Sequence, residues 1–252
     1  MKASLPLAFI ILLLVNVLVT SCDSKRQEGI TIAVAWEGAL KNMMRKGDVS
    51  AQVDLKDLIG DPNLYALGAV SELKGEILVL DGLPIIASVQ ENQLRIDTTF
   101  NREATLLVYA SVDDWVAEEV PAEVTTKQDL EAYIEASAAD NGINTDAPFP
   151  FRLRGTLTKA DWHVIDWPAG DTEHTHKKHI ESGLSGTLEG ELVEVLGFYS
   201  KHHHAIFTHH STNMHMHLRT LDNRIVGHLD DLLLGNGVEI FLPKREQLPR
   251  TQ

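Results

Sequence analysis

The alternation of hydrophobic and polar residues predicts a first half that combines strands with helices. Alternating or wholly apolar runs predict strands at residues 30–36, 76–80, 84–89, 93–97 and 105–112. Apolar residues three and four positions apart predict helices at residues 39–46, 53–59 and 127–139. Asp81-Gly82 separates two of the strands and is typical of a hairpin turn. We therefore expect a domain that contains both a sheet and helices.

The second half has a different pattern, in which short apolar runs follow one another with few helical signals. Strands are predicted at residues 151–157, 162–167, 185–190, 192–199, 205–208 and 238–242. Only residues 229–234 also fit a helix. Short strands at this spacing are typical of a barrel or sandwich. With the domain junction in the loop at 144–150, we expect an α/β (α+β) domain at 30–146 and a C-terminal β domain at 147–252.

A hairpin is predicted at residues 213–229, and it carries three histidines. The Asp222-Asn223 pair between its two apolar runs tolerates positive φ and suits a tight turn. If these two residues form the turn, His217 lies directly across from His228. His215 precedes His217 by two positions, so it lies on the same face of its strand.

Such a register brings three imidazoles to one point of the sheet. Directly opposed residues have Cβ atoms about 5 Å apart, and diagonal ones about 7 Å. Three imidazole ligands suit a metal ion, most readily Zn²⁺, with one position open for water or substrate. The alternative is that His215, His217 and His228 are ordinary strand residues.

The N-terminal segment has the features of a targeting signal. An apolar run at residues 5–19 is closely followed by Cys22, and it is shorter than the ~20 residues that a membrane-spanning helix needs. Residues 1–22 resemble a bacterial lipoprotein signal, in which Cys22 is lipidated, and residues 23–29 form a polar tether. Because Cys22 is the single cysteine, this interpretation is favoured over an ordinary signal peptide or an anchor. We expect an exported lipoprotein on the periplasmic or cell-surface side of a membrane.

Charge and histidine content add two expectations. The formal net charge of −14 argues against nucleic acid as a partner, because phosphates bind basic surfaces. All 12 histidines follow residue 162. Three of them, His174, His176 and His179, could form a second metal cluster, but their charged neighbours favour a solvated loop. His209 or His210 is expected to line the pocket beside the predicted hairpin.

Several segments together resemble the α-acetolactate decarboxylase family. Residues 68–78, followed by Asp81-Gly82, are similar to the family's Gly-Thr-Phe-x-x-Leu-Asp-Gly-Glu-Leu-Ile segment and its Asp-Gly turn. Residues 152–157 are similar to its Arg-x-x-Gly-Thr-Phe strand. Residues 214–218 and 226–229 resemble its Tyr-His-Leu-His-Phe strand and Gly-Gly-His-Val partner, and this His-X-His plus Gly-His pair is the most specific part.

The resemblance implies a fold and a reaction. The fold is an N-terminal domain on a mixed sheet and a C-terminal β-barrel that holds zinc on the three histidines. The reaction converts (S)-2-acetolactate, a small 2-hydroxy-3-keto acid, to (R)-acetoin and CO₂. Zinc suits this chemistry as a Lewis acid. Glu76 matches the family's catalytic glutamate, which suits proton transfer. Arg154 and Ala69 are implied to contact the substrate, and a homodimer is possible.

The chain departs from the family at two places. His163 stands where the family has an arginine, eight residues after Gly155, and we expect it near the substrate carboxylate with a charge that depends on pH. We find no match for a glutamate that the family draws from its C-terminal end. Two alternatives therefore stay open. One is a related lyase or isomerase for another 2-hydroxy-3-keto acid, and the other is a non-catalytic exported lipoprotein that binds zinc or copper.

Overall fold

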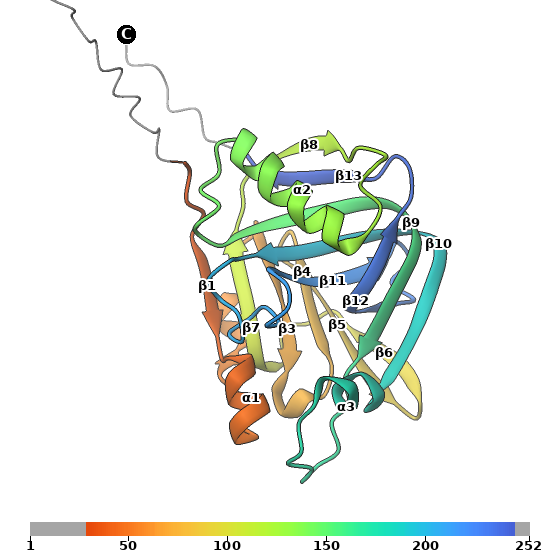
Figure 1. Cartoon of the computed structure of the whole chain (residues 1–252). Helices are drawn as coiled ribbons and strands as arrows, with labels where there is room; N and C mark the ends of the chain where they lie inside the picture. Colours follow the sequence, from red (N-terminus) through yellow and green to blue (C-terminus); the bar gives the residue numbers. More distant parts are fainter. Residues whose placement is uncertain (1–28, 245–252) are drawn as a thin grey trace, which may run out of the picture.

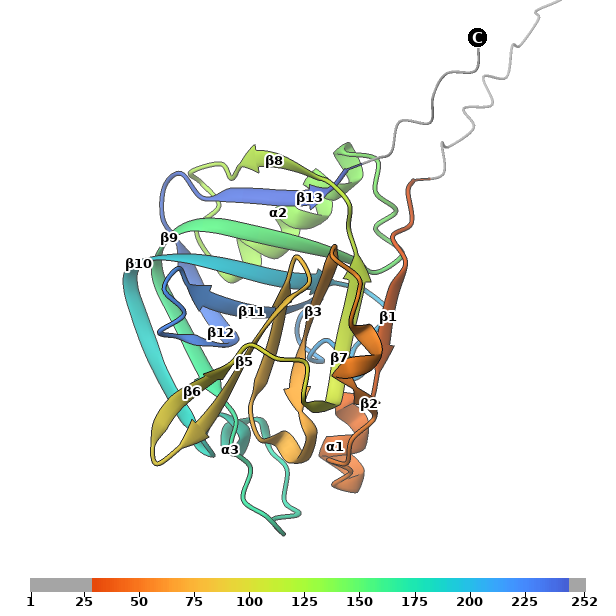
Figure 2. The same cartoon turned by 180° about the vertical axis from the view of Figure 1, so that it is seen from behind.

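The computed structural model describes residues 29–244, which fold mostly into β-strands with few helices. The strands form two sheets that lie against each other (Figures 1 and 2). The predicted signal at residues 1–22, with Cys22, lies outside the described residues. Within residues 29–244, no helix is both long enough and apolar enough to cross a membrane.

The first sheet has the strand order β1-β7-β3-β4-β5-β6, with β2 paired to β7. The bounds are β1 (Val34–Glu37), β2 (Val53–Asp54), β3 (Leu64–Val70), β4 (Glu76–Leu80), β5 (Leu83–Gln90), β6 (Gln93–Asp97) and β7 (Glu103–Ser111). Every one of these pairings is antiparallel. The resemblance implied a mixed sheet, and the structure corrects this to an antiparallel one. The predicted turn between β4 and β5 forms, with positive φ at both Asp81 and Gly82.

Two of the three predicted helices form in the first half of the chain. They are α1 (Leu40–Lys46), which ends at Gly47 in the left-handed conformation, and α2 (Lys127–Asp140). The helix predicted at residues 53–59 was wrong. Val53 and Asp54 pair with β7 as β2 instead, and only the short 3₁₀ helix η1 (Leu55–Leu58) follows. A second 3₁₀ turn, η2 (Ser71–Leu73), joins β3 to β4.

The second sheet confirms the predicted barrel as a partly closed sheet. Its order is β10-β11-β12-β9-β13-β8, and a further pairing between β10 and β9 closes four of the strands into a ring. The bounds are β8 (Trp115–Glu119), β9 (Phe149–Val164), β10 (Leu184–Tyr199), β11 (Met214–Thr220), β12 (Val226–Leu234) and β13 (Glu239–Pro243). The short helix α3 (His176–Glu181) lies between β9 and β10 in the chain.

Three predictions for the second half need correction. β9 and β10 are each one long strand where the sequence predicted two, because they pair with each other from end to end. Residues 229–234 continue β12 as a strand rather than a helix. Residues 205–208 contribute only an isolated bridge between His204 and Thr208.

The transition between the two sheets occurs before the predicted domain junction. The strand β8, which the sequence did not predict, pairs with β13 and so belongs to the second sheet. Figure 1 shows α2 lying across this sheet beside β8 and β13. The boundary at residues 146–147 stays a prediction.

One core joins the two sheets and fixes their relative position. It contains Leu67 and Leu78 of the first sheet together with Phe198 and Leu218 of the second. The opposite face of β4 packs Ile77 into a smaller cluster beneath η1. β4 is thus buried on both faces, and residues 76, 78 and 80 of β4 face the barrel.

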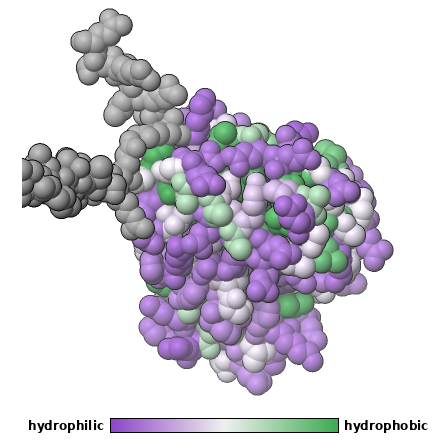
Figure 3. Space-filling model, turned by 45° about the horizontal axis from the view of Figure 1, so that its top comes forward, coloured by the Kyte–Doolittle hydropathy of each residue, from purple (hydrophilic) through white to green (hydrophobic). Residues whose placement is uncertain are grey.

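The face of the molecule shown in Figure 3 is mostly polar. On the face shown in Figure 3, hydrophobic residues are scattered among hydrophilic ones. Single exposed apolar residues such as Ile59 and Leu83 are normal for a folded protein.

Candidate metal centre

The three histidines take the register that the sequence predicted. His217 pairs directly with His228 across β11 and β12. The turn between the strands uses the predicted residues, since Asn223 has a positive φ and the Asp222 carboxylate accepts the backbone N–H of Arg224 at 3.1 Å.

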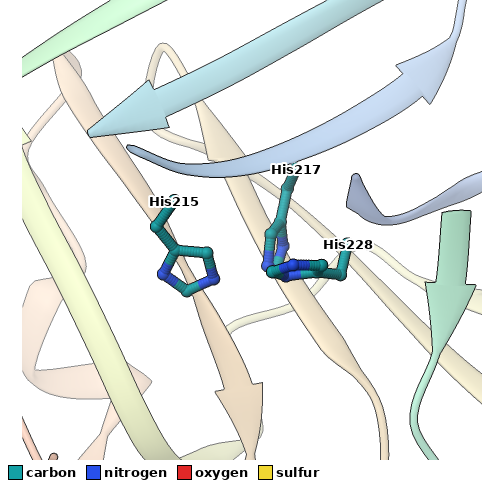
Figure 4. A group of neighbouring side chains, drawn as sticks. All are labelled: His215, His217 and His228. Carbon is teal, nitrogen blue, oxygen red and sulfur yellow. The ribbon is translucent and has the colours of Figure 1, made fainter. Parts of the chain in front are cut away.

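The three rings meet on one face of the barrel. Ring nitrogens of His215, His217 and His228 all lie within 4.8 Å of one another, and the ring centroids are 5.1–5.3 Å apart. Figure 4 shows the three side chains gathered at one place, two from β11 and one from β12. This separation of donors fits one small ion, because Zn–N bonds are about 2 Å long.

Burial and missing partners also fit a metal ion. His217 is fully buried, and neither of its ring nitrogens has a hydrogen-bond partner within the part of the chain that the structure describes. Nδ1 of His215 is also buried and has no hydrogen-bond partner among the described residues. Buried polar atoms of this kind are normally satisfied, so a ligand is expected at them.

The protonation state of the histidines favours metal binding as well. Burial lowers the pKa of His215 to about 3 and lowers the pKa of His217 and of His228 well below its usual range. The neutral imidazole is the form that coordinates metals. The group could therefore bind a metal ion, and imidazole ligands suit zinc, copper, iron and nickel.

Glu76 lies beside the three histidines, as the resemblance implied. It begins β4 of the first sheet, and its Oε2 is 3.5 Å from Nε2 of His217 in the second. Its neighbours across β3 and β5 are Ala69 and Ala87, whose small side chains leave room around the carboxylate. Burial raises the pKa of Glu76 to about 8, although His163 and a backbone hydrogen bond oppose this.

His163 also reaches the site, from β9. It pairs with His228 of β12, and its Nε2 lies 3.9 Å from Oε1 of Glu76. A glycine allows the two strands to approach here, because a Cβ on Gly227 would lie 2.5 Å from the carbonyl oxygen of His163. The Gly-His order of the motif thus places His228 next to His163.

Asp230 is a site residue that sequence reasoning missed. Its Oδ2 lies 2.8 Å from Nδ1 of His163, while its Oδ1 is buried without a partner among the described residues. Burial acts to lower the pKa of His163, but the hydrogen bond to Asp230 and the charge of Glu76 outweigh it and raise that pKa. The available signal was alternation, since Asp230 follows His228 by two positions, but residues 229–234 also fitted a helix.

A cavity of about 330 Å³ opens onto the three-histidine group. Ala69 lines it, as the resemblance implied, together with Glu76 and His163. Arg154 does not line it, because its side chain is exposed on β9, so the structure does not bring this predicted substrate contact to the cavity. Lys127, at the start of α2, lines the cavity and was not predicted.

Several of the other histidines surround the same cavity. His176 and His179 line it from α3, which corrects the favoured interpretation of a solvated loop. His174 stacks on Trp167, with ring centroids 4.4 Å apart, and its Nδ1 lies 3.0 Å from Nε2 of His179. His209 lines the cavity, as was expected of it or its neighbour.

Comparisons with known proteins agree with this arrangement at the level of the fold. No protein-family model and no curated protein matches the sequence. Solved structures do match it. An acetolactate decarboxylase from Bacillus subtilis subspecies spizizenii has a TM-score of 0.69 and 12% identity, over 86% of this chain and 90% of that chain.

Two further structures give the same result. The α-acetolactate decarboxylase of Bacillus subtilis strain 168 has a TM-score of 0.68 at 12% identity, over 84% of this chain and 86% of that chain. A Staphylococcus aureus protein of unknown function, described as similar to α-acetolactate decarboxylase, has a TM-score of 0.65 at 14% identity, with the same coverage. The chain therefore has the fold of the α-acetolactate decarboxylases and carries a buried group of three histidines that could bind a metal ion.

Proposed function

We propose that this protein is a zinc-dependent decarboxylase of (S)-2-acetolactate or of a closely related 2-hydroxy-3-keto acid. The observation that carries the proposal is the meeting of Glu76 with His217, a buried carboxylate 3.5 Å from a buried imidazole in a small cavity. A carboxyl group placed beside a metal site in a small cavity is suited to deliver a proton to a carbanion.

The chemistry requires a place for electrons and a source of a proton. When the bond between C2 and the carboxylate breaks, CO₂ leaves and its electron pair stays on C2, in conjugation with the adjacent ketone. A metal ion on the three histidines would supply a Lewis acid for the hydroxyl and ketone oxygens. Glu76 then gives its proton to carbon, which completes acetoin.

Residues around Glu76 can hold it in position and keep water away. His163 faces one carboxylate oxygen of Glu76 while Asp230 holds the other side of the imidazole. Met43, Leu73 and Phe207 form an apolar part of the cavity wall, beside its histidines. Such an apolar surface limits the access of water protons to the carbanion.

The test is to load the protein with zinc, add racemic acetolactate and measure acetoin and CO₂. We expect both products to form in equal amounts, with at most half of the racemate consumed if one enantiomer is accepted. The control is His217→Ala, which removes a metal ligand. Equal rates for the two proteins, or no acetoin from either, would contradict the proposal.

A second candidate is a metal-binding lipoprotein without catalytic activity, anchored at Cys22. It is favoured by one observation, the presence of His176, His179 and His209 on the cavity wall beside the three-histidine group. Stoichiometric zinc or copper binding, combined with no turnover of acetolactate, would support this candidate instead.

A further inference from the structure

Lys127 is a cation whose backbone is fixed next to the strand that carries His228. It is the first residue of α2, directly after the capping residue Thr126. The side-chain oxygen of Thr126 accepts the N–H of Asp129 at 3.2 Å, so the helix start is well defined. The helix start is also tied to β12, because the carbonyl of Thr125 accepts the N–H of Leu234 at 2.9 Å.

Lys127 lines the cavity, and the protein uses only part of the hydrogen-bonding capacity of its ammonium group. Nζ donates to the main-chain carbonyl of Asp230 at 2.8 Å. No ion pair between Lys127 and a carboxylate occurs within residues 29–244. Because a lysine ammonium has three N–H donors, donors are left for a ligand in the cavity.

Lys127 lies close to the metal site. It lines the same cavity as His215 and His228, and its Nζ bonds to the main chain of Asp230, two positions after His228. Burial lowers the pKa of Lys127 itself, while the charges of Asp231, Asp230 and Glu131 act in the opposite direction. An ion bound beside the histidines would thus lie close to this ammonium.

The other cationic candidate, His163, is already occupied by acidic partners. Its Nδ1 contacts Asp230 at 2.8 Å, and its Nε2 faces Glu76 at 3.9 Å. Nδ1 is thus held by a carboxylate of the protein, and Nε2 lies beside the carboxyl group of Glu76 without bonding to it. This arrangement fits a positioning role for His163 toward Glu76. A carboxylate of the substrate placed at His163 would lie next to two acidic side chains of the protein, whereas Lys127 forms no ion pair with a carboxylate within residues 29–244.

We propose that Lys127 binds the carboxylate of the 2-hydroxy acid, an inference that rests on the proposed function. An ammonium fits this task as a compact charge, in place of the arginine that the family resemblance would have required at residue 163. Lys127 and the three histidines then distinguish the two ends of the substrate, with the acid at the start of α2 and the oxygens of the hydroxyl and ketone at the histidines.

The experiment is calorimetric titration of the zinc-loaded protein with 2-hydroxy-2-methylbutanoate and with its uncharged amide, which has nearly the same shape. In Lys127→Met, we expect the affinity for the acid to fall at least about tenfold, because a charged hydrogen-bond partner is lost. The affinity for the amide should stay within a factor of about two. Lys127→Arg should retain most of the affinity for the acid.

A matched control is Lys56→Met, which removes an exposed lysine outside the cavity. All variants are compared at equal zinc content, and Lys127→Gln gives the same test should the methionine variant not fold. Unchanged affinity of Lys127→Met for the acid would overturn the inference, as would a wild-type protein that does not bind the acid. Acetolactate turnover is measured separately. If Lys127→Met turns over acetolactate with an unchanged KM, only the proposed role of Lys127 is contradicted. If the wild type does not turn over acetolactate, the proposed function itself is contradicted.

Discussion

Glu76 and His217 belong to different sheets, and their side chains come within 3.5 Å of each other. Glu76 starts β4, and His217 lies on β11, whose partner strand β12 packs against β4. Both side chains are buried, so they meet only when the two sheets share one core. The site is therefore a product of the whole fold, although its metal ligands come from a single hairpin.

His217→Ala should abolish stoichiometric zinc binding. The substitution removes the most deeply buried of three ligands, and two imidazoles alone do not complete a protein zinc site. Zinc content after dialysis, measured by atomic emission, should fall from one ion per chain to a small fraction. His204→Ala is the control, since His204 is exposed, its side chain contacts Asn213 and it does not line the cavity. Full zinc in His217→Ala would show that the ion binds elsewhere.

Asp230→Asn should reduce acetoin formation by about 10–100-fold, the usual effect of losing a partner that orients a group at a metal site. The 2.8 Å contact between Asp230 and His163 fixes the imidazole that faces Glu76. Asp231→Asn is a matched control on the same strand, because Asp231 is exposed and does not line the cavity. Equal kcat/KM values for the two variants would argue against a positioning role for Asp230.

The sequence was sufficient to predict the hairpin because an antiparallel register is decided locally. Once Asp222-Asn223 is the turn, the pairing of His217 with His228 follows from strand geometry. Glu76 was found through the family resemblance. Its burial, however, depends on packing between sheets, which hydrophobic patterns do not encode.

Other parts of the site escaped prediction for identifiable reasons. Residues 229–234 form a short apolar-rich segment, and such segments fit helix and strand equally well. A shift in the register of β12 between Leu229 and Asp231 further disrupts the alternation that would have marked Asp230. Lys127 reaches the cavity only because α2 packs against β12, a contact between residues about a hundred positions apart.

Glu194→Gln should make the protein less stable at neutral pH and less sensitive to acid. Glu194 is buried between Arg152 and Arg219, and Nη2 of Arg219 donates to its Oε2 at 2.6 Å. Burial acts to raise the pKa of Glu194, but hydrogen bonds and charges from both arginines outweigh it and lower that pKa. The pKa of Glu194 is lower in the folded than in the unfolded protein. The stability that its carboxylate contributes is therefore present above the unfolded pKa of about 4.3 and is lost as pH falls through the folded pKa.

Urea unfolding at pH 7, 5 and 4 would measure this effect. The glutamine variant should lose about 1.5–3 kcal/mol of unfolding free energy at pH 7, and its stability should fall less steeply in acid than that of the wild type. Glu189→Gln provides the control, because Glu189 is exposed on the same strand. Parallel pH profiles for wild type and Glu194→Gln would contradict the prediction.

Cys22→Ser should release the protein from the membrane fraction of a host that processes lipoproteins. This proposal comes from the sequence alone, since Cys22 lies outside the described residues. Lipid attached to the thiol of Cys22 would provide the anchor, and serine lacks that thiol. Fractionation followed by immunoblotting distinguishes the outcomes. A serine variant that stays with the membranes would show that the apolar segment at residues 5–19 is itself the anchor.

Glu76→Gln should leave the fold and the zinc content intact while it lowers acetoin formation by about 10²–10⁴-fold, the usual contribution of a positioned proton donor. Glutamine keeps the shape and burial of the side chain, but it cannot give a proton to carbon. Loss of CO₂ can continue without that proton, so the product that forms should come from protonation by solvent and should be less enantiopure. The measurements are zinc content, acetoin rate and chiral analysis of the acetoin. Wild-type rate and enantiopurity in Glu76→Gln would mean that the proton comes from another group on the cavity wall, even though Glu76 lies within 4 Å of His217.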